Sequence, residues 1–308
     1  MCEPLQYPHS CNPVCKKRGC GVLYVCDGIW KAHFKHCSFI VQNHISDIPL
    51  VNFPSICTEE PIRAKGSKFC PKHAVIAESL GINPTGSSRN DLRSEIPGMQ
   101  ILFQAAHQTS AAKGIELPSN SEASTLPCYK QLGETKTKID RSRGYLFIVR
   151  AGGHVESFAP IYGSESPSQV FLILIAWMYL VLQGVPVEKW GEIFIAYDNM
   201  CNLDKIRATK VLLPLPYPYN SLWINGMTKV IDGFHLSNHK SGDCHTKYNP
   251  EHIKQIHPNL ETSNTQACEQ TFSWLGAFQY ALFQMPKYHQ IFFLHRIVQR
   301  RNRYLEKR

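Results

Sequence analysis

Cysteine and histidine side chains crowd the first part of this chain, at spacings that can bind metal ions. Eight of the twelve cysteines lie within the first 70 of 308 residues. Cys11-x3-Cys15-x4-Cys20 and Cys70-x2-His73 have the spacing of zinc ligands, and tetrahedral zinc needs four such donors. The candidate ligands are Cys11, Cys15, Cys20, Cys26, His33, Cys37, Cys57, Cys70 and His73. They suffice for one structural Zn²⁺ site or two; the alternative is a set of buried structural thiols.

A secreted, disulfide-bonded scaffold is another interpretation of so many cysteines. The stretch MCEPLQYPHSC has neither the basic nor the apolar region of a signal peptide, so nothing in it directs the chain to an oxidising compartment. We therefore expect reduced, metal-binding thiols. The longest apolar run, residues 170–182, has thirteen residues, fewer than the roughly 20 that cross a bilayer core. It predicts a buried helix, and we expect no membrane partner.

Three carboxylates follow predicted elements of the C-terminal half and form the second candidate site. They are Asp198, Asp232 and Glu269. Carboxylates that converge from separate elements bind Mg²⁺ or Mn²⁺, and two such metals about 4 Å apart promote phosphoryl transfer. Taken singly, each acid is more often a helix cap or a surface residue, and Asp232-Gly233 can simply begin a turn.

Softer donors are interleaved with these acids. Cys201, His235, His239 and Cys244 are the residue types that zinc prefers. They predict a separate structural Zn²⁺ site that holds the loop after the sheet.

The positive charge of the chain lies at its two ends. The formal net charge is +9, and residues 285–308 carry seven Lys or Arg against one acid. Arg296, Arg300 and Arg303 fall on one face of a predicted helix, with Arg301 beside them. Such a stripe can contact DNA phosphates; the alternative is a solvated helix face.

Composition divides the chain into three zones. Residues 1–80 predict a Cys/His-rich zinc-binding domain, residues 81–143 a flexible linker rich in Ser, Thr, Gly and Pro, and residues 144–308 an α/β domain. With 43% hydrophobic and 19% charged residues, the chain as a whole is neither disordered nor collagen-like. P-loop, GxGxxG and GxSxG signatures are absent from the sequence.

The α/β zone has a recognisable order of elements. Residues 145–149 and 154–162 predict a hairpin, residues about 168–183 an apolar helix, and residues 193–197 a buried strand that ends at Asp198. This order is expected of an RNase H-like sheet, although many α/β folds share it. Asp27 and Trp30, in CDGIW, are equally well explained as structural or functional residues.

Several segments resemble one known family. YDNMCNLDK, VIDGFHLSNHKSGDC and NTQACEQTFSWLGAFQYALFQMPKYHQIFFLHRIVQRRNRYL are similar to the Kyakuja/Dileera/Zisupton (KDZ) transposase-like family. The likeness covers about 160 residues of this chain and extends to the C-terminal region of animal HMG domain-containing proteins that carry a KDZ-derived segment. CGVLYVCDGIWKAHFKHC and GSKFCPKH are similar to the cysteine cluster that accompanies these domains.

The resemblance implies an RNase H-like, DDE transposase-type core preceded by a small zinc-stabilised Cys/His-rich domain. Carried over by motif, Asp198 and Glu269 are catalytic acids, and Asp232 begins the DGFH segment. DNA is the implied partner and the nucleus the implied location, while no particular protein partner is indicated.

One departure from the family pattern bears on function. An RNase H-like site places an acid on its first strand, but YLFIVRAGGHVES has Arg150 and a glycine pair there. A cation would oppose metal binding by like-charge repulsion. We therefore expect a domesticated-transposon protein, DNA- or chromatin-associated and zinc-binding, with impaired catalysis. The alternative is an active DDE-type transposase or nuclease that uses Mg²⁺ or Mn²⁺ to cleave and join DNA.

Overall fold

The fold is described for most of the chain outside the region between the Cys/His-rich segment and the α/β zone. The computed structural model describes residues 9, 11–29, 32–39, 57–62, 66–83, 85, 141–162, 165–260 and 262–307. Apart from its two ends, the expected linker at 81–143 lies outside the described residues.

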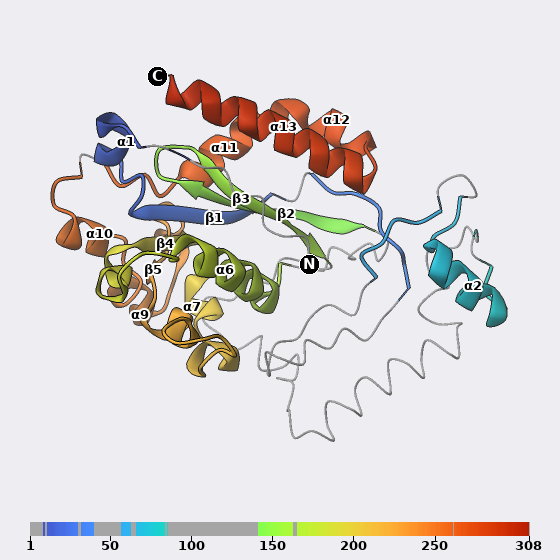
Figure 1. The fold of residues 1–308 in the computed structure, drawn as a ribbon, viewed down its shortest axis with the longest axis horizontal. Coiled ribbons are helices and arrows are strands. Elements are labelled where there is room, and N and C mark those ends of the chain that lie inside the picture. The colour runs from blue at the N-terminus through green and yellow to red at the C-terminus, as the bar shows by residue number, and fades with distance from the viewer. Residues whose placement is uncertain are drawn as a thin grey trace.

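A five-stranded mixed sheet forms the centre of the molecule (Figure 1). The strands are β1 (Leu23–Ile29), β2 (Ser142–Arg150), β3 (Val155–Tyr162), β4 (Phe194–Tyr197) and β5 (Thr228–Val230). Their order across the sheet is β3-β2-β1-β4-β5. The β1–β2 and β2–β3 pairs are antiparallel, whereas β1–β4 and β4–β5 are parallel. The chain therefore has the mixed α/β architecture that its sequence predicts.

The central strand comes from the Cys/His-rich segment. β1 pairs with β2 on one side, from Tyr24↔Arg150 to Ile29↔Tyr145, and with β4 on the other. This strand of residues 1–80 therefore completes the same sheet as strands of residues 144–308, and the division of the chain into three domains stays a prediction. Strand pairing depends on partners more than a hundred residues away, which composition does not reveal.

Alternating side chains of the sheet feed two separate cores. Leu23 and Val25 point to one face of β1, and Tyr24 and Cys26 point to the other. This period of two is what an extended strand imposes, and burial on both sides explains why β1 reads as a nearly continuous apolar run.

The face to which Tyr24 and Cys26 point is covered by the apolar helix that the sequence predicts. α6 (Pro167–Val181) begins at Ser166, whose side chain accepts a hydrogen bond from the backbone N–H of Gln169, with Pro167 in the first turn. Trp177 on α6 is fully buried. The short helices α7 (Met200–Leu203) and α8 (Leu222–Asn225) complete this layer.

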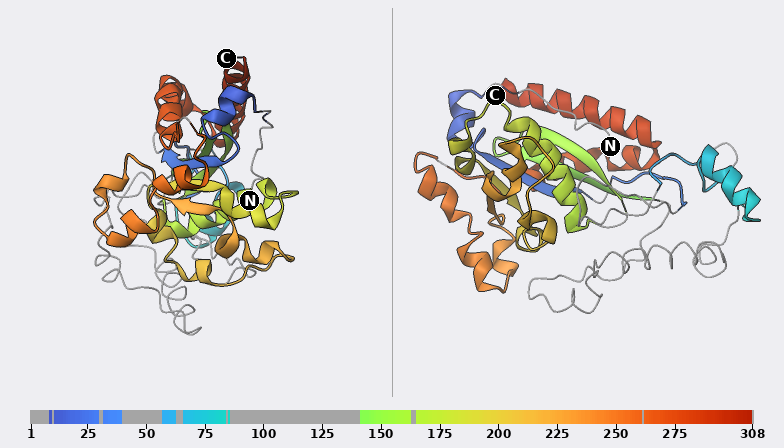
Figure 2. Two further views of the ribbon diagram at one scale, coloured as in Figure 1. Left: turned by 90° about the vertical axis from the view of Figure 1, so that its left-hand side faces the viewer. Right: turned by 60° about the horizontal axis from the view of Figure 1, so that its bottom comes forward.

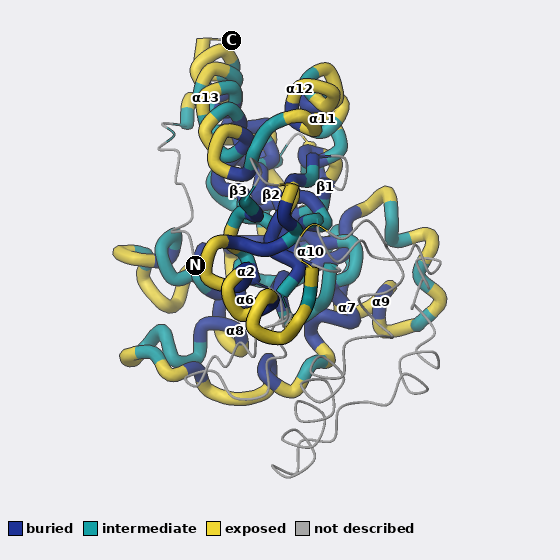
Figure 3. The backbone as a smooth tube through the Cα atoms, turned by 90° about the vertical axis from the view of Figure 1, so that its right-hand side faces the viewer, coloured by how far each residue is buried: buried dark blue, intermediate teal, exposed yellow. Residues whose placement is uncertain are grey.

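The opposite face is covered by the C-terminal helices. They are α11 (Ala267–Leu275), α12 (Gln279–Gln284) and α13 (Lys287–Glu306). α13 runs along the sheet for twenty residues and buries Leu294 and Val298 (Figures 1 and 2). Figure 3 shows buried residues in the strands at the centre and exposed residues on the outer sides of α12 and α13.

The remaining helices lie at the ends and edges of the sheet. α1 (Pro13–Lys17) lies near the C-terminal end of α13, while α2 (Pro71–Ser79) lies beyond the far end of the sheet (Figures 1 and 2). The others are α9 (Gly242–Thr246) and α10 (Glu251–Ile256), with short 3-10 turns at Val187–Glu192, Arg207–Lys210, Tyr219–Ser221, Leu236–Asn238 and Gly276–Phe278. Among the described helices none has the length and apolar character needed to span a membrane.

Candidate acidic centre and Cys/His groups

Three acids gather where the parallel strands end. β1, β4 and β5 run in the same direction, so their carboxyl ends meet at one edge of the sheet. Asp27 lies near the carboxyl end of β1, Asp198 directly follows β4, and Asp232 comes two residues after β5. The residues two positions before them, Val25, Ala196 and Val230, all belong to the core beneath α11–α13. By strand alternation the three acids therefore face that same side.

The fourth acid arrives from the helix above this edge. Glu269 lies in the first turn of α11, and the neighbouring Cys268 Sγ donates a hydrogen bond to the Val25 carbonyl, 3.2 Å away. This contact holds the start of α11 against β1. Glu269 Oε1 lies 3.9 Å from His235 Nδ1, which in turn lies 2.5 Å from Asp232 Oδ2.

Asp232 acts mainly on its own loop. Its Oδ1 accepts hydrogen bonds from the backbone N–H groups of Phe234 and His235, at 2.9 and 3.1 Å, while its Oδ2 binds the His235 ring. This hydrogen bond raises the pKa of His235. The sequence assigned His235 to zinc, but the structure brings it to Asp232 and Glu269 instead.

The pKa values of the acids reflect burial and mutual repulsion. Burial, followed by the charges of Asp198, Glu165 and Glu269, raises the pKa of Asp27 well above its usual range. Burial and then Glu165 raise the pKa of Asp198 to about 7. Burial also raises the pKa of Glu269, and Asp232 adds to the effect. Like charges that share a buried site disfavour one another unless a proton or a cation compensates them.

Two carboxylate oxygens in this centre are buried without a donor. Among the described residues, Asp198 Oδ1 and Glu269 Oε2 have no hydrogen-bond partner. Oxygen donors of this kind, within a set of repelling carboxylates, fit a divalent cation such as Mg²⁺ or Mn²⁺. Asp27, Asp198 and Glu269 are the residues that would hold it.

Asp27 is the functional candidate that the sequence leaves undecided between a structural and a functional role. The strand-like run VLYVCDGI ends near this acid, and that pattern was the available signal. The sequence instead placed the first strand at 145–149 and found Arg150 at its end. In the structure that segment is β2, and Arg150 forms an ion pair with Glu156 while its guanidinium lies 5.6 Å from the Tyr24 ring centroid. Arg150 therefore does not occupy the place of a catalytic acid.

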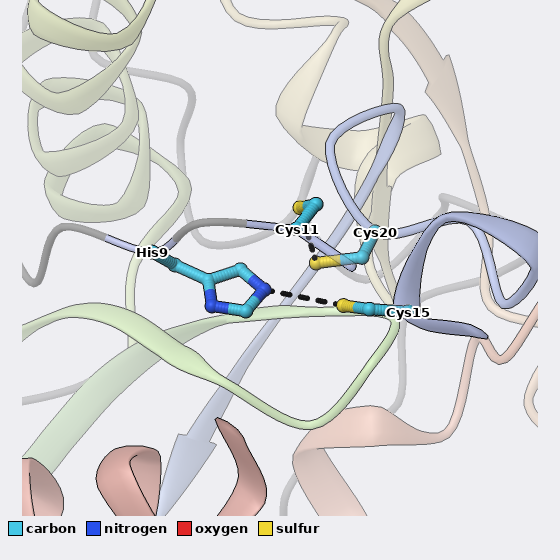
Figure 4. Close-up of side chains that lie close together, drawn as sticks. All are labelled: His9, Cys11, Cys15 and Cys20. Carbon is cyan, nitrogen blue, oxygen red and sulfur yellow. Dashed lines mark hydrogen bonds between the residues drawn. The ribbon is translucent and has the colours of Figure 1, made fainter. Parts of the chain in front are cut away.

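The first Cys/His group lies beside α1 and contains His9, Cys11, Cys15 and Cys20 (Figure 4). Their candidate ligand atoms all lie within 4.8 Å of one another. Cys11 Sγ is 3.4 Å from Cys20 Sγ, and His9 Nε2 is 3.1 Å from Cys15 Sγ. Burial raises the pKa of both Cys15 and Cys20, so the desolvated thiols are protonated unless a cation binds. Three thiols and an imidazole are a donor set that fits zinc.

Local structure explains how these ligands converge. Asn12 caps α1 by accepting the backbone N–H of Cys15 at 2.7 Å. Cys15 then turns inward against the β2–β3 turn, where a Cβ on Gly152 would lie 3.0 Å from its sulfur. His9 was missed because it precedes the first cysteine of the spacing pattern.

The second group contains Cys37, Cys57, Cys70 and His73, all buried. His73 Nδ1 lies 3.5 Å from Cys37 Sγ and 3.4 Å from Cys70 Sγ. Phe39 stacks on the His73 ring with centroids 4.2 Å apart. Burial raises the pKa of Cys37 to about 12. This donor set also fits zinc, and it contains the Cys70-x2-His73 pair that the spacing predicts.

The third group contains Cys201, His239 and Cys244, carried by α7, the loop before α9, and α9. His239 Nδ1 lies 3.5 Å from Cys201 Sγ. Three of the four donors that the sequence grouped here are therefore together, without His235.

The remaining predicted ligands lie elsewhere. Cys26 packs into the core beneath α6. His33 Nδ1 is 3.1 Å from an Arg141 nitrogen, and its ring meets Phe283 edge-on.

The basic residues of α13 divide into two sets. Arg296, Arg300 and Arg303 line one hollow of about 400 Å³, together with Phe293, Ile297 and Gln299. Arg301 lies on another side of the helix, with its guanidinium 4.6 Å from the Trp274 ring centroid, and burial lowers its pKa. Arg296, Arg300 and Arg303 thus lie together on one surface of α13, whereas Arg301 packs against α11.

Comparison with known families identifies the C-terminal part of the chain. A model of the Kyakuja-Dileera-Zisupton transposase family matches residues 105–302, which is more than half of the sequence. The matched range begins after β1, so Asp27 lies outside it. Searches of the curated proteins and of the solved structures each found no match.

Proposed function

Because the chain belongs to the KDZ transposase family, we propose that it is a transposase-derived, zinc-stabilised DNA-cleaving and DNA-joining protein. Its substrate is duplex DNA in the nucleus, and its catalytic acids are Asp27, Asp198 and Glu269. The observation that carries this proposal is the placement of Asp27 on the central strand, beside the strand that Asp198 follows. The ground for expecting impaired catalysis was Arg150, and that residue is engaged with Glu156.

An RNase H-like core is the fold that best accommodates this site. Its support is an antiparallel β3-β2-β1 ribbon continued by two parallel strands. One acid lies on the first strand in chain order, another directly follows the fourth, and a third lies on a C-terminal helix. Ligands of open α/β sheets bind outside the carboxyl ends of parallel strands, which is where these acids lie.

The residues divide the chemistry among themselves. A bound Mg²⁺ or Mn²⁺ supplies stabilisation of the charge that develops on phosphate oxygens. Asp198 and Glu269 offer their buried oxygens as ligands, and Asp27 brings the central carboxylate. His235 Nδ1 contacts Asp232 Oδ2 and lies 3.9 Å from Glu269 Oε1, so Asp232 holds the imidazole beside Glu269. Asp232 is therefore a positioning residue.

The Cys/His groups and the basic helix support this centre. The first two groups each offer four donors that would hold zinc, and the third group offers three. Arg296, Arg300 and Arg303 present three cations on one surface of α13, which suits phosphate contacts of a DNA backbone.

Nicking of supercoiled plasmid DNA in Mn²⁺ tests the proposal. Wild-type protein converts the plasmid to the open-circular form, and Asp27→Asn, Asp198→Asn and Glu269→Gln each reduce the rate by at least about 10²-fold, as expected for loss of a group that stabilises developing charge. Glu251→Gln, an exposed carboxylate on α10, is the matched control and retains full activity.

Two results would count against the proposal. Full activity in Asp27→Asn would remove Asp27 from the site. A wild-type protein that binds DNA but never nicks it would favour the alternative, a DNA- or chromatin-associated protein without catalysis.

A further inference from the structure

The last turn of α13 reaches the first Cys/His group through one contact. His9 is almost fully buried, with 3% of its side chain exposed, and its two ring nitrogens face different partners. Nε2 lies 3.1 Å from Cys15 Sγ, whereas Nδ1 lies 3.4 Å from Glu306 Oε1. A residue near one end of the chain thus joins the thiols to a carboxylate nearly 300 positions away.

This geometry is the one that a metal-bound histidine adopts. Such a histidine binds the metal through one nitrogen and donates the N–H of the other to a carboxylate, which fixes the ring and its tautomer. Here the nitrogen beside the thiols is Nε2, and the nitrogen beside the carboxylate is Nδ1. Glu306 is the single acid of α13, and it lies at the point where this helix meets His9.

The surroundings enclose His9 between α13 and the β2–β3 turn. The His154 ring stacks on the His9 ring with centroids 3.6 Å apart. Asn302, one turn before Glu306, binds both the N–H and the carbonyl of Val155, at 3.1 and 2.9 Å. Leu305 lies 3.6 Å from where a Cβ on Gly153 would sit. The end of α13, the hairpin turn and the thiol group therefore form one contiguous contact.

We propose that Glu306 positions His9 as a ligand of the first Cys/His group, and that metal binding there holds the C-terminal turns of α13 on the sheet. Because Arg300 and Arg303 lie in those turns, metal occupancy controls the presentation of the basic surface to DNA. The inference rests on the zinc binding and DNA binding proposed above, and it makes the first regulate the second.

His154 offers a competing arrangement. His9, His154 and Glu306 also have ligand atoms within 4.8 Å of one another, and neither His154 nitrogen has a hydrogen-bond partner among the described residues. The two arrangements share His9, so they are alternatives for one metal. The thiol arrangement has four donors against three, and it contains the softer ligands that zinc prefers.

Zinc affinity of the full-length protein tests the link without any DNA. Competition with a chromophoric chelator measures the affinity of each zinc equivalent. Glu306→Ala weakens one equivalent by about 10–100-fold, the usual cost of removing such an outer carboxylate, and Glu306→Gln weakens it less. Lys307→Ala, in the same turn, and Glu251→Gln, an exposed carboxylate, leave all affinities unchanged. Unchanged affinity in Glu306→Ala would overturn the proposal.

Hydrogen exchange gives the second readout. In the wild type, removal of zinc accelerates exchange in residues 299–306 by at least about tenfold, and Glu306→Ala accelerates it with zinc present. Unchanged protection after zinc removal would refute the link to α13. Loss of that zinc equivalent in His154→Ala, but not in Cys11→Ser, would assign the metal to the competing arrangement. Neither readout depends on catalysis. A protein that fails to nick plasmid DNA can therefore still show the link between zinc and α13, and the two proposals can fail separately.

Discussion

The first and second Cys/His groups offer similar donors, three thiols and one imidazole, but they occupy different structural settings. The first group lies against the main sheet, where Gly152 and Arg150 of the β2–β3 hairpin approach its sulfurs. The second lies beyond the end of the sheet with α2 (Figure 1). Within the described part of the chain its small core has six buried members, of which three are the candidate ligands Cys37, Cys57 and Cys70.

The difference assigns a different task to each metal. Among the residues that the structure describes, Phe69, Ala74 and Ala77 are the buried members of this core other than cysteine, with Phe39, Ile62 and Ile82 packed against them. A core of this size needs a further staple such as a metal to form a stable unit. At the first group the neighbouring sheet and helices supply a large core of their own. A metal bound there would fasten segments that are already folded, whereas a metal bound at the second group would take the place of a core.

Cys70→Ser is expected to have the largest effect. It removes one of four donors from a unit that cannot fold without them, so the protein loses one zinc equivalent and α2 exchanges its amide hydrogens at nearly the unfolded rate. The measurement is zinc content with hydrogen exchange of residues 66–83. Val75→Ala, which truncates an exposed side chain on α2, is the control. Preserved protection of α2 without zinc would break the comparison between the two groups.

Cys15→Ser is expected to have an intermediate effect. The protein stays folded, because the sheet and α6 do not depend on this group, but the end of α13 loosens. We expect a loss of about 3 kcal/mol, as for other disrupted metal sites, and a Tm lower by roughly 6–12 °C. Calorimetry measures it, with Val14→Ala on the exposed side of α1 as the control. Complete unfolding would show that the first group, too, replaces a core.

Asp204→Asn is expected to have the smallest effect. It provides a reference for the two Cys/His groups, because the region around Asp204 is held by hydrogen bonds and not by candidate metal ligands. Asp204 accepts hydrogen bonds from Lys247, Tyr248 and Trp223, at 2.6, 2.7 and 2.9 Å. Burial alone would raise the pKa of Asp204, but these hydrogen bonds lower it from 3.8 to about 2. Its stabilisation is therefore complete above pH 4 and is lost as the pH falls toward 2.

The shift corresponds to at most about 2 kcal/mol, reduced by solvent around the exposed lysines. Denaturant unfolding at pH 6 and pH 3 measures it: the wild type loses part of its stability on acidification, and Asp204→Asn is less stable at pH 6 and loses less. Equal pH dependence in both proteins would contradict this assignment. Lys205→Ala is the control, because it lies beside Asp204 and is exposed.

Local patterns predict the parts of this fold that local sequence determines. The hairpin, α6 and the strand before Asp198 follow from alternation, a serine cap and an apolar run. β1 does not, because its partners are distant and its cysteines draw attention to metal binding. Asp27 was left undecided for the same reason. The sequence names the thiols of each group and groups Cys201, His239 and Cys244. It does not divide the N-terminal ligands between two sites or include His9, which precedes the spacing pattern, and His235 has the same spacing whether it meets zinc or a carboxylate.

The central position of β1 also has a consequence for protein synthesis. Leu23 pairs with Phe194, so about 170 further residues are translated before both neighbours of β1 exist. At ~5–20 residues per second this takes roughly 10–35 s. Until β2 has been made, both edges of this apolar strand are unpaired, and until β4 has been made one edge stays unpaired, a state prone to aggregation. A chaperone that shields residues 22–29 on the nascent chain would raise the yield of folded protein.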